Sequence, residues 1–259
     1  MKYETVHGIS IPKIGFGTWT IGGGSNANPK LDSVSLAALH SALEVGYAEE
    51  LIGRALRETN TKRENVFITT KVSPEHLQYE QVLRSCENSL RRLNMDYIDL
   101  YLIHWPRISM KLEESFRALN KLVRDGKVKH LGVSNFNMKL LKQSESLSET
   151  PILTDQVPYS IQDLSYVRNG VLEYCQQNDI LLTAYSPVEK GRLKVNQTLQ
   201  SVAEDHGATP YQIALAWLVA QPRVITIPMS LNTQHIRENF ESANVELTSH
   251  ESKSLSELW

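Results

Sequence analysis

Two residues whose side chains could do chemistry end apolar runs of this sequence. Lys71 follows "VFITT", and His104 follows "IDLYLI" and precedes Trp105. A lysine cation lowers the pKa of a neighbouring acid, and an imidazole can donate a hydrogen bond to a carbonyl oxygen. A strand-end lysine that reaches solvent, or a histidine satisfied within the core, would look the same in isolation. The elements that carry the two residues decide between these interpretations.

Short β-branched runs alternate along the chain with stretches of helical periodicity. The run "HGISIPKIGFG" predicts an N-terminal hairpin with His7-Gly8 as its turn. Strands are expected at 13–19, 65–72, 97–105, 129–136, 151–157, 180–187 and 223–230, and helices at 33–45, 48–58, 81–93, 112–126, 138–147, 170–178, 198–207, 209–221 and 233–243. This alternation predicts parallel strands with crossover helices. At 259 residues it favours an α/β fold of the (β/α)8 TIM barrel type, formed as a single domain over residues 1–259.

Most of the expected strands end in polar or aromatic residues, as the active face of such a barrel requires. These ends are Thr18-Trp19, Lys71, His104-Trp105, Ser134-Asn135, Gln156, Tyr185-Ser186 and Met229-Ser230. The strands number seven, whereas the barrel needs eight. The apolar stripes of helices 33–45 and 48–58 meet where Tyr47 joins Ala48, with no strand between them. Strand 2 is therefore not represented in the sequence, and a barrel does not close without it because tilt, stagger and strand number are linked.

Composition argues against several classes of function. A formal net charge of −2 gives no reason to expect a nucleic acid or an anionic membrane as partner. The start "MKYETVHGIS" lacks the apolar run of a secretory signal, and Cys86 and Cys175 lie in helical stretches without a CxxC pattern, so a cytoplasmic protein is expected. No histidine or carboxylate pair has metal-ligand spacing, so no metal is expected. No heptad seam points to a dimer, which predicts a monomer.

Eight blocks of the chain, in order, resemble the aldo-keto reductase family almost from end to end. They read "IPKIGFGTW", "AEELIGRAL", "VFITTKV", "RRLNMDYIDLYLIHWP", "LVRDGKVKHLGVSNF", "LLTAYSP", "TPYQIALAWLVAQPRVITIP" and "HIRENF". The resemblance implies that a hydride passes from NAD(P)H to an aldehyde or ketone carbon while a tyrosine protonates the oxygen. It also implies that a lysine lowers the pKa of that tyrosine, an aspartate pairs with the lysine, and a histidine orients the carbonyl. Lys71 and His104 match the lysine and the histidine.

The aspartate and the tyrosine of the family belong to a segment of the form D-T-A-x-x-Y-G, expected between "EVGY" and "AEELIG". Here Tyr47 is joined directly to Ala48, so both residues are absent from the sequence. Tyr47 matches the residue that opens the missing strand better than it matches the catalytic tyrosine, for which it is a weaker substitute. Either the segment has not been recorded, or the chain is engineered or has lost part of its catalytic set.

By the same resemblance, the cofactor lies extended across the barrel mouth. Ser134, Asn135 and Gln156 would hold the nicotinamide carboxamide, and Tyr185 would stack on the ring. Trp19 and Trp105 would line the pocket of a small carbonyl substrate. The remaining implied cofactor residues are Gly17, Thr18, Ser186, Pro187, Val188, Ile227, Pro228, Met229, Ser230, Leu231, Asn232, His235, Glu238 and Asn239.

Two of these positions depart from the family pattern. Met229 and His235 stand where the family usually has a lysine and an arginine that bind the adenosine 2′-phosphate. We therefore expect NADP(H) with a weakened preference, and NAD(H) as a second cofactor. The expected function is reduction of aldehydes or ketones to alcohols by hydride transfer. The alternatives are a catalytically impaired barrel that binds NADP(H) as a binding or regulatory module, and an engineered or incomplete chain.

Overall fold

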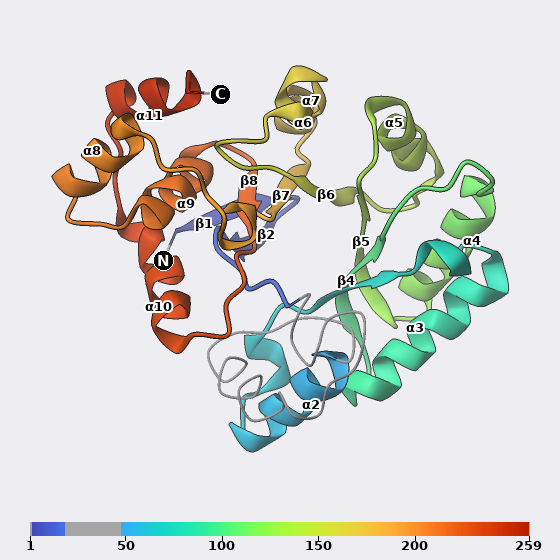
Figure 1. The fold of residues 1–259 in the computed structure, drawn as a ribbon. Coiled ribbons are helices and arrows are strands. Elements are labelled where there is room, and N and C mark those ends of the chain that lie inside the picture. The colour runs from blue at the N-terminus through green and yellow to red at the C-terminus, as the bar shows by residue number, and fades with distance from the viewer. Residues whose placement is uncertain (1, 19–47, 259) are drawn as a thin grey trace. The chain divides into compact units, whose positions relative to one another are not determined.

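The computed structural model describes residues 2–18 and 48–258, and Figure 1 follows the path of the chain. The chain forms two compact units: Met1–Gly17 with Val157–Trp259, and Thr18–Gln156. The helix expected at 33–45, the aromatic residue Trp19 and the junction at Tyr47 lie outside the described residues.

A hairpin opens the chain, as the His7-Gly8 pair predicted. Strands β1 (Tyr3–Val6) and β2 (Ile9–Pro12) are antiparallel, with Val6 opposite Ile9. His7 and Gly8 have φ angles of 46° and 78°. Both values are positive, as a type I′ turn requires, and the two-residue loop fixes the register of the hairpin.

The prediction of a strand over residues 13–19 is wrong for the part that the structure describes. Within residues 13–18 only Ile14 forms a bridge, parallel to Thr226 of β8 (Val224–Thr226). Backbone hydrogen bonds nevertheless run from Gly15 N to Thr226 O at 2.8 Å and from Gly17 N to Pro228 O at 3.0 Å. A Cβ added at Gly17 would lie 2.5 Å from the carbonyl oxygen of Ile227, so glycine is what allows the two backbones to come this close.

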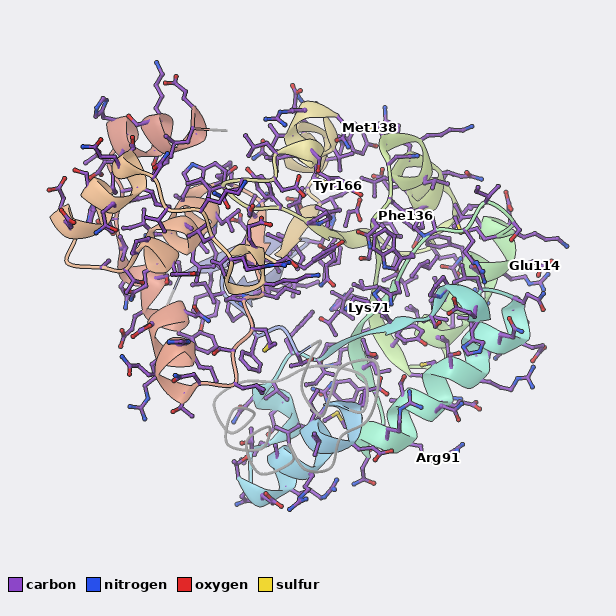
Figure 2. All side chains as sticks on the ribbon, in the orientation of Figure 1. Lys71, Arg91, Glu114, Phe136, Met138 and Tyr166 are labelled. Carbon is purple, nitrogen blue, oxygen red and sulfur yellow. The ribbon has the colours of Figure 1, made fainter. Side chains whose placement is uncertain are left out.

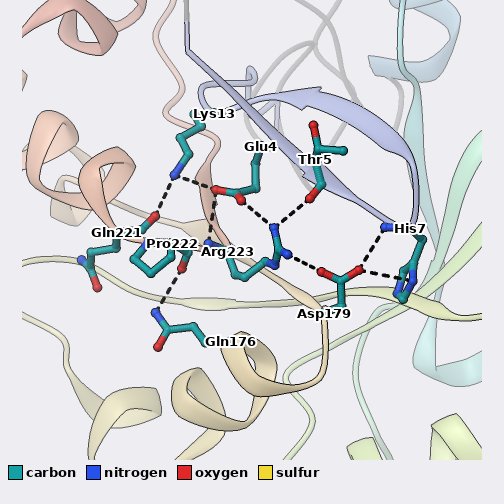
Figure 3. A network of polar contacts seen from close by, with 9 residues as sticks. All are labelled: Glu4, Thr5, His7, Lys13, Gln176, Asp179, Gln221, Pro222 and Arg223. Atoms are coloured by element: carbon teal, nitrogen blue, oxygen red, sulfur yellow. Dashed lines mark hydrogen bonds and ion pairs between the residues drawn. The ribbon is translucent and has the colours of Figure 1, made fainter.

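A polar network ties the hairpin to the C-terminal part of its own unit (Figure 3). The Glu4 carboxylate pairs with Lys13 at 2.8 Å and accepts a hydrogen bond from Arg223 Nη1 at 2.7 Å. Arg223 also pairs with Asp179, whose Oδ2 accepts from the backbone N–H of His7 at 3.2 Å. Burial acts to raise the pKa of Glu4, but the bonds from Lys13 and Arg223 outweigh it and hold that pKa below its ordinary value.

The unit Thr18–Gln156 is built from parallel strands and crossover helices. Its strands are β3 (Thr69–Val72), β4 (Ile98–Ile103), β5 (Val128–Ser134) and β6 (Ile152–Pro158), whose last two residues belong to the other unit. Each pairs with the next in parallel, and the sequence order is kept. Its helices are α2 (Ala48–Glu58), α3 (Tyr79–Leu93), α4 (Leu112–Arg124) and α5 (Met138–Leu147). Consecutive helices pack side by side (Figure 1).

The other unit contains β7 (Leu181–Tyr185) paired in parallel with β8. Its helices are α6 (Ser165–Arg168), α7 (Val171–Gln177), α8 (Gln197–Asp205), α9 (Pro210–Ala220), α10 (Thr233–Glu241) and α11 (Ser249–Ser256). Helix α9 begins as the Thr209-Pro210 pair predicted, with a capping box between Thr209 and Gln212. Helices α6 and α11 were not predicted from the sequence pattern. Within the described residues, no helix is both long enough and apolar enough to cross a membrane.

Two buried carboxylates fix the unit Thr18–Gln156 internally. Glu49 of α2 accepts from Thr70 Oγ1 at 2.7 Å and from Arg92 Nε at 2.5 Å. Asp99 of β4 accepts from the backbone N–H of Ile68 at 2.9 Å and pairs with Lys129 and Arg63 at the same end of the strand. A buried carboxylate is costly unless it is paired, and both of these are.

Helix α2 crosses α3 at a glycine. A Cβ added at Gly53 would lie 2.3 Å from the carbonyl oxygen of Leu93. We therefore expect Gly53→Ala to lower the free energy of unfolding by roughly 1–3 kcal/mol, although alanine is intrinsically the better helix former by about 1 kcal/mol. Urea unfolding measures the change. Glu50→Ala on the exposed side of the same helix is the control, with an expected change below about 0.5 kcal/mol. Unchanged or higher stability of Gly53→Ala would contradict this close contact.

Candidate active site at the carboxyl ends of the strands

Lys71 and His104 lie on neighbouring strands, at the same edge of the sheet. Lys71 of β3 is beside Leu102 of β4, and the backbone N–H of His104 donates to Val72 O at 3.1 Å. Figure 2 labels Lys71 at the end of β3. Both side chains are half-buried, so neither is an ordinary solvent-exposed group. The parallel register is what places a cation and an imidazole next to each other.

The pKa of His104 is lowered to about 4. Burial of the ring is the largest cause and the Lys71 cation is the second, while Glu75 acts weakly in the opposite direction. The imidazole is therefore neutral at neutral pH and carries one N–H donor and one acceptor nitrogen. The single N–H of the neutral imidazole can therefore donate a hydrogen bond to a carbonyl oxygen beside the Lys71 cation.

The next strands bring a hydroxyl and two amides to the same edge. Ser134 Oγ donates to Gln156 O at 2.7 Å, and the backbone N–H of Asn135 donates to the same oxygen at 3.0 Å. The Asn135 side chain donates to Ser134 Oγ at 2.9 Å and to His104 O at 3.1 Å. Asn135 has a φ of 63°, which turns the chain sharply at the end of β5. A set of one hydroxyl and two amides offers both donors and acceptors, as a carboxamide ligand requires.

Trp105 follows the imidazole and is 46% exposed. The centroids of its ring and that of His104 are 6.5 Å apart. A large aromatic side chain left this open beside polar groups can serve as an apolar wall for a small ligand. Its predicted partner Trp19 lies outside the described residues, and Thr18 is buried at the end of the described N-terminal segment.

The remaining predicted cofactor residues lie in the unit that contains β7 and β8. Tyr185 ends β7, and Ser186 after it has a φ of 52°. Ile227 N donates to Ala184 O at 3.1 Å, so the segment after β8 runs beside the end of β7. Gly17 joins this segment through its backbone bond to Pro228. The other predicted residues lie at the end of β7 or in the segments after β7 and β8: Tyr185, Ser186, Pro187, Val188, Ile227, Pro228 and Met229.

The predicted adenosine-end residues lie in the loop before α10 and along that helix. Ser230 Oγ accepts from Asn232 N at 3.0 Å, and Asn232 Oδ1 accepts from Gln234 N at 2.8 Å and His235 N at 3.4 Å. Asn232 is thus the N-cap of the helix. The other predicted members, Leu231, Glu238 and Asn239, lie on the same loop and helix. Of the two residues predicted to stand where the family pattern has cations, Met229 directly precedes Ser230 and His235 lies in the first turn of α10.

One site residue was missed by the sequence analysis. Asp155 precedes Gln156 in β6 and is fully buried behind the Ser134-Asn135 turn. An aspartate within the apolar run "ILTDQV" was a usable signal, because aspartate is rarely buried. In the part of the chain that the structure describes, no group of three or more His, Cys, Asp or Glu side chains is arranged to hold a metal.

The proximity of Lys71 to His104 is testable by titration. We expect Lys71→Met to raise the pKa of His104 above the wild-type value of about 4, because a neighbouring cation is lost. The pKa should stay below 6.5, because burial is the larger cause and persists. NMR of the imidazole C–H protons across pH 3–8 measures both values. Lys139→Met on the exposed face of α5 is the control and should change nothing. A wild-type pKa at or above 6.5 would contradict the burial of this ring.

The aldo/keto reductase family model matches residues 13–259. The glyoxal reductase of Bacillus subtilis is 35% identical over 247 residues, covering 93% of this chain and 87% of the relative. The methylglyoxal reductase YeaE of Escherichia coli is 33% identical over 262 residues, covering 94% and 89%.

Solved structures give the same result. The thermostable aldo-keto reductase Tm1743, in complex with the inhibitor epalrestat, superposes with a TM-score of 0.95 at 40% identity, over 100% of both chains. An aldo-keto reductase of Klebsiella pneumoniae in complex with NADPH has a TM-score of 0.87 at 31% identity, covering 100% of this chain and 96% of that one. The α/β class and the (β/α)8 barrel predicted from the sequence are confirmed by these neighbours. The chain therefore belongs to the aldo-keto reductase family, the enzymes that reduce aldehydes and ketones to alcohols with NAD(P)H.

Proposed function

We propose that this chain is a single-domain, cytoplasmic and monomeric reductase of small aldehydes and ketones, with α-dicarbonyls such as glyoxal and methylglyoxal as preferred substrates. The juxtaposition of Lys71 with the neutral His104 carries the proposal. The named activities of the two bacterial relatives support the substrate class. The match of the family model over residues 13–259 supports one domain.

NADPH is the proposed cofactor, since solved relatives are complexes with NADP or NADPH. When bound, it supplies the hydride. Ser134, Asn135 and Gln156 would hold the nicotinamide carboxamide, because their hydroxyl and amide groups match its donors and acceptors. Thr18 is a further proposed cofactor residue of the same unit. In the unit that contains β7 and β8, Tyr185 would contact the ring, and Ser230 and Asn232 at the start of α10 would bind the adenosine end.

His104 and Lys71 act on the carbonyl oxygen. Negative charge accumulates on that oxygen as the carbon accepts the hydride, so donors already aimed at it stabilise the transition state. His104 donates its single N–H to the oxygen and orients it, and the half-exposed ring of Trp105 provides an apolar wall beside it. Lys71 is the cation that favours proton release from the acid of the site.

A second candidate function follows from the absence of the proton-donating acid from the sequence. The family tyrosine and its aspartate belong to a segment expected between Tyr47 and Ala48, and the sequence joins these two residues directly. This observation favours the alternative of a barrel that binds NADP(H) without turnover, as a binding or regulatory module. The two functions differ in turnover and share cofactor binding, so one pair of assays separates them.

The first experiment measures NADPH consumption with methylglyoxal, together with quenching of tryptophan fluorescence by NADPH. We expect the wild-type chain to consume NADPH. We expect Lys71→Met to lower kcat about 10²–10⁴-fold, because positioned proton transfer contributes a rate factor of that size. Lys139→Met is the matched control and should keep the wild-type kcat. Quenching without turnover in the wild-type chain would overturn the reductase and establish the binding module.

Cofactor preference is the second experiment. Because Met229 and His235 carry no fixed charge, we expect NADH to be used alongside NADPH. Met229→Lys combined with His235→Arg should shift the Kd ratio toward NADPH about tenfold or more, since a hydrogen bond to a charged group contributes about 1.5–3 kcal/mol. Fluorescence titration with both cofactors gives the ratio. Met229→Gln, which adds length without charge, should leave it unchanged, and an equal shift in that variant would exclude the charge effect.

A further inference from the structure

Asp155 is a carboxyl group that the proposed chemistry does not use. It lies in β6, where its side chain has no solvent exposure. Its neighbour Gln156 lies opposite Ser134 of β5. Gln156, Ser134 and Asn135 together form the set of hydroxyl and amide groups proposed to bind the nicotinamide carboxamide. A buried aspartate in this place needs a reason, because burial without a counter-ion disfavours the charged form.

The contacts of Asp155 are all on one side of the carboxyl group. Its Oδ1 accepts from the backbone N–H of Phe136 at 3.4 Å, and the backbone N–H of Asn135, which donates to Gln156 O, acts with it to lower the pKa of Asp155. Its Oδ2 is buried and has no hydrogen-bond partner. Figure 2 labels Phe136 just after β5. The carboxyl group thus supports the turn at Asn135 from behind, the same turn whose side chains face the proposed cofactor.

Among the described residues, no cation acts on the pKa of this carboxyl group. Burial raises its pKa to about 8, against a smaller lowering by the backbone N–H groups of Phe136 and Asn135. The charged residues of α5, the helix that follows the turn, are Lys139, Lys142 and Glu145, and none of them contributes to the shift. The carboxyl group is therefore mostly neutral at pH 7 and ionises in the mildly alkaline range.

We propose that Asp155 is a positioning residue of the cofactor site, whose neutral carboxyl holds the Ser134–Phe136 turn in the form that binds the nicotinamide carboxamide and whose ionisation releases it. The inference rests on the proposed function, because it assumes that this cluster binds the cofactor. It adds a proton switch on binding that acts through the backbone, at a residue that does not touch the ligand.

The direction follows from the contacts. An ionised carboxyl with an unpaired buried oxygen must recruit water or further donors. Burial is the cause that disfavours the charged form, so ionisation favours an opening of the turn that lets water reach the unpaired oxygen. Such an opening disturbs the bonds at 2.7–3.1 Å that order Ser134 and Asn135. Cofactor affinity is thus full below pH 7 and falls as pH rises through about 8, by up to tenfold per pH unit.

The test is the Kd of NADPH, measured by tryptophan quenching between pH 7 and 9.5. The wild-type Kd should rise about twentyfold from pH 7.5 to pH 9.5 if its pKa is about 8. Asp155→Asn keeps the shape and is always neutral, so its Kd should match wild type at pH 7 within threefold and stay flat. Asp155→Ala removes the support and should bind about tenfold more weakly at every pH. Asp125→Asn, an exposed aspartate at the end of α4, should keep the wild-type profile.

Melting temperatures measured over this pH range show whether each variant is folded. If Asp155→Ala does not fold, the comparison of the wild type with Asp155→Asn still tests the proposal. Parallel pH profiles for the wild type and Asp155→Asn would overturn the switch and leave the proposed function standing. So would wild-type affinity at pH 7 in a folded Asp155→Ala. Absence of quenching in every protein at every pH would instead overturn the proposed function, and the inference would fall with it.

Discussion

The parallel hydrogen-bond ladder is the constraint on which the site depends. In parallel strands the carboxyl ends meet at one edge, so residues distant in the sequence converge there without any dedicated contact. Lys71 is beside Leu102, and Ser134 is beside Gln156. A slip of one residue in any of these pairings would turn the functional side chain of that strand to the opposite face. The buried acids Glu49 and Asp99, each paired with cations, resist such a slip.

The Asn135 side chain connects the proposed cofactor site to the strand end that carries His104. Asn135 reaches Ser134 with one hydrogen bond and the carbonyl of His104 with another. The site proposed for the cofactor amide and the strand end that carries the imidazole therefore share a single side chain. A disturbance of the turn at Asn135 is transmitted to the backbone of His104, and this coupling needs no moving domain.

The sequence predicted the parts of this structure that depend on local pattern. Helix α5 begins and ends where the periodicity placed it, and the caps at Thr209 and the turn at His7-Gly8 have recognisable chemistry. The short helices α6 and α11 were missed because tertiary packing, more than propensity, stabilises so few residues. The strand at 13–19 was overestimated, because backbone approach at Gly17 replaces a regular ladder. The lowered pKa of His104 depends on burial and on a cation from another strand. The raised pKa of Asp155 depends on burial that no single segment encodes.

The hairpin network has a consequence for how the chain acquires its structure. Glu4 bonds to Arg223 across 219 residues, and His7 bonds to Asp179 across 172. Contacts of such high sequence separation form slowly, because a long loop must close before they contribute. On the ribosome the hairpin emerges before its charged partners Asp179 and Arg223, which are synthesised 172 and 219 residues after the hairpin residues that they contact. The two strands of the hairpin are available early as a local unit, but docking against Arg223 waits until the chain has been synthesised to that residue, which separates hairpin formation from hairpin docking in time.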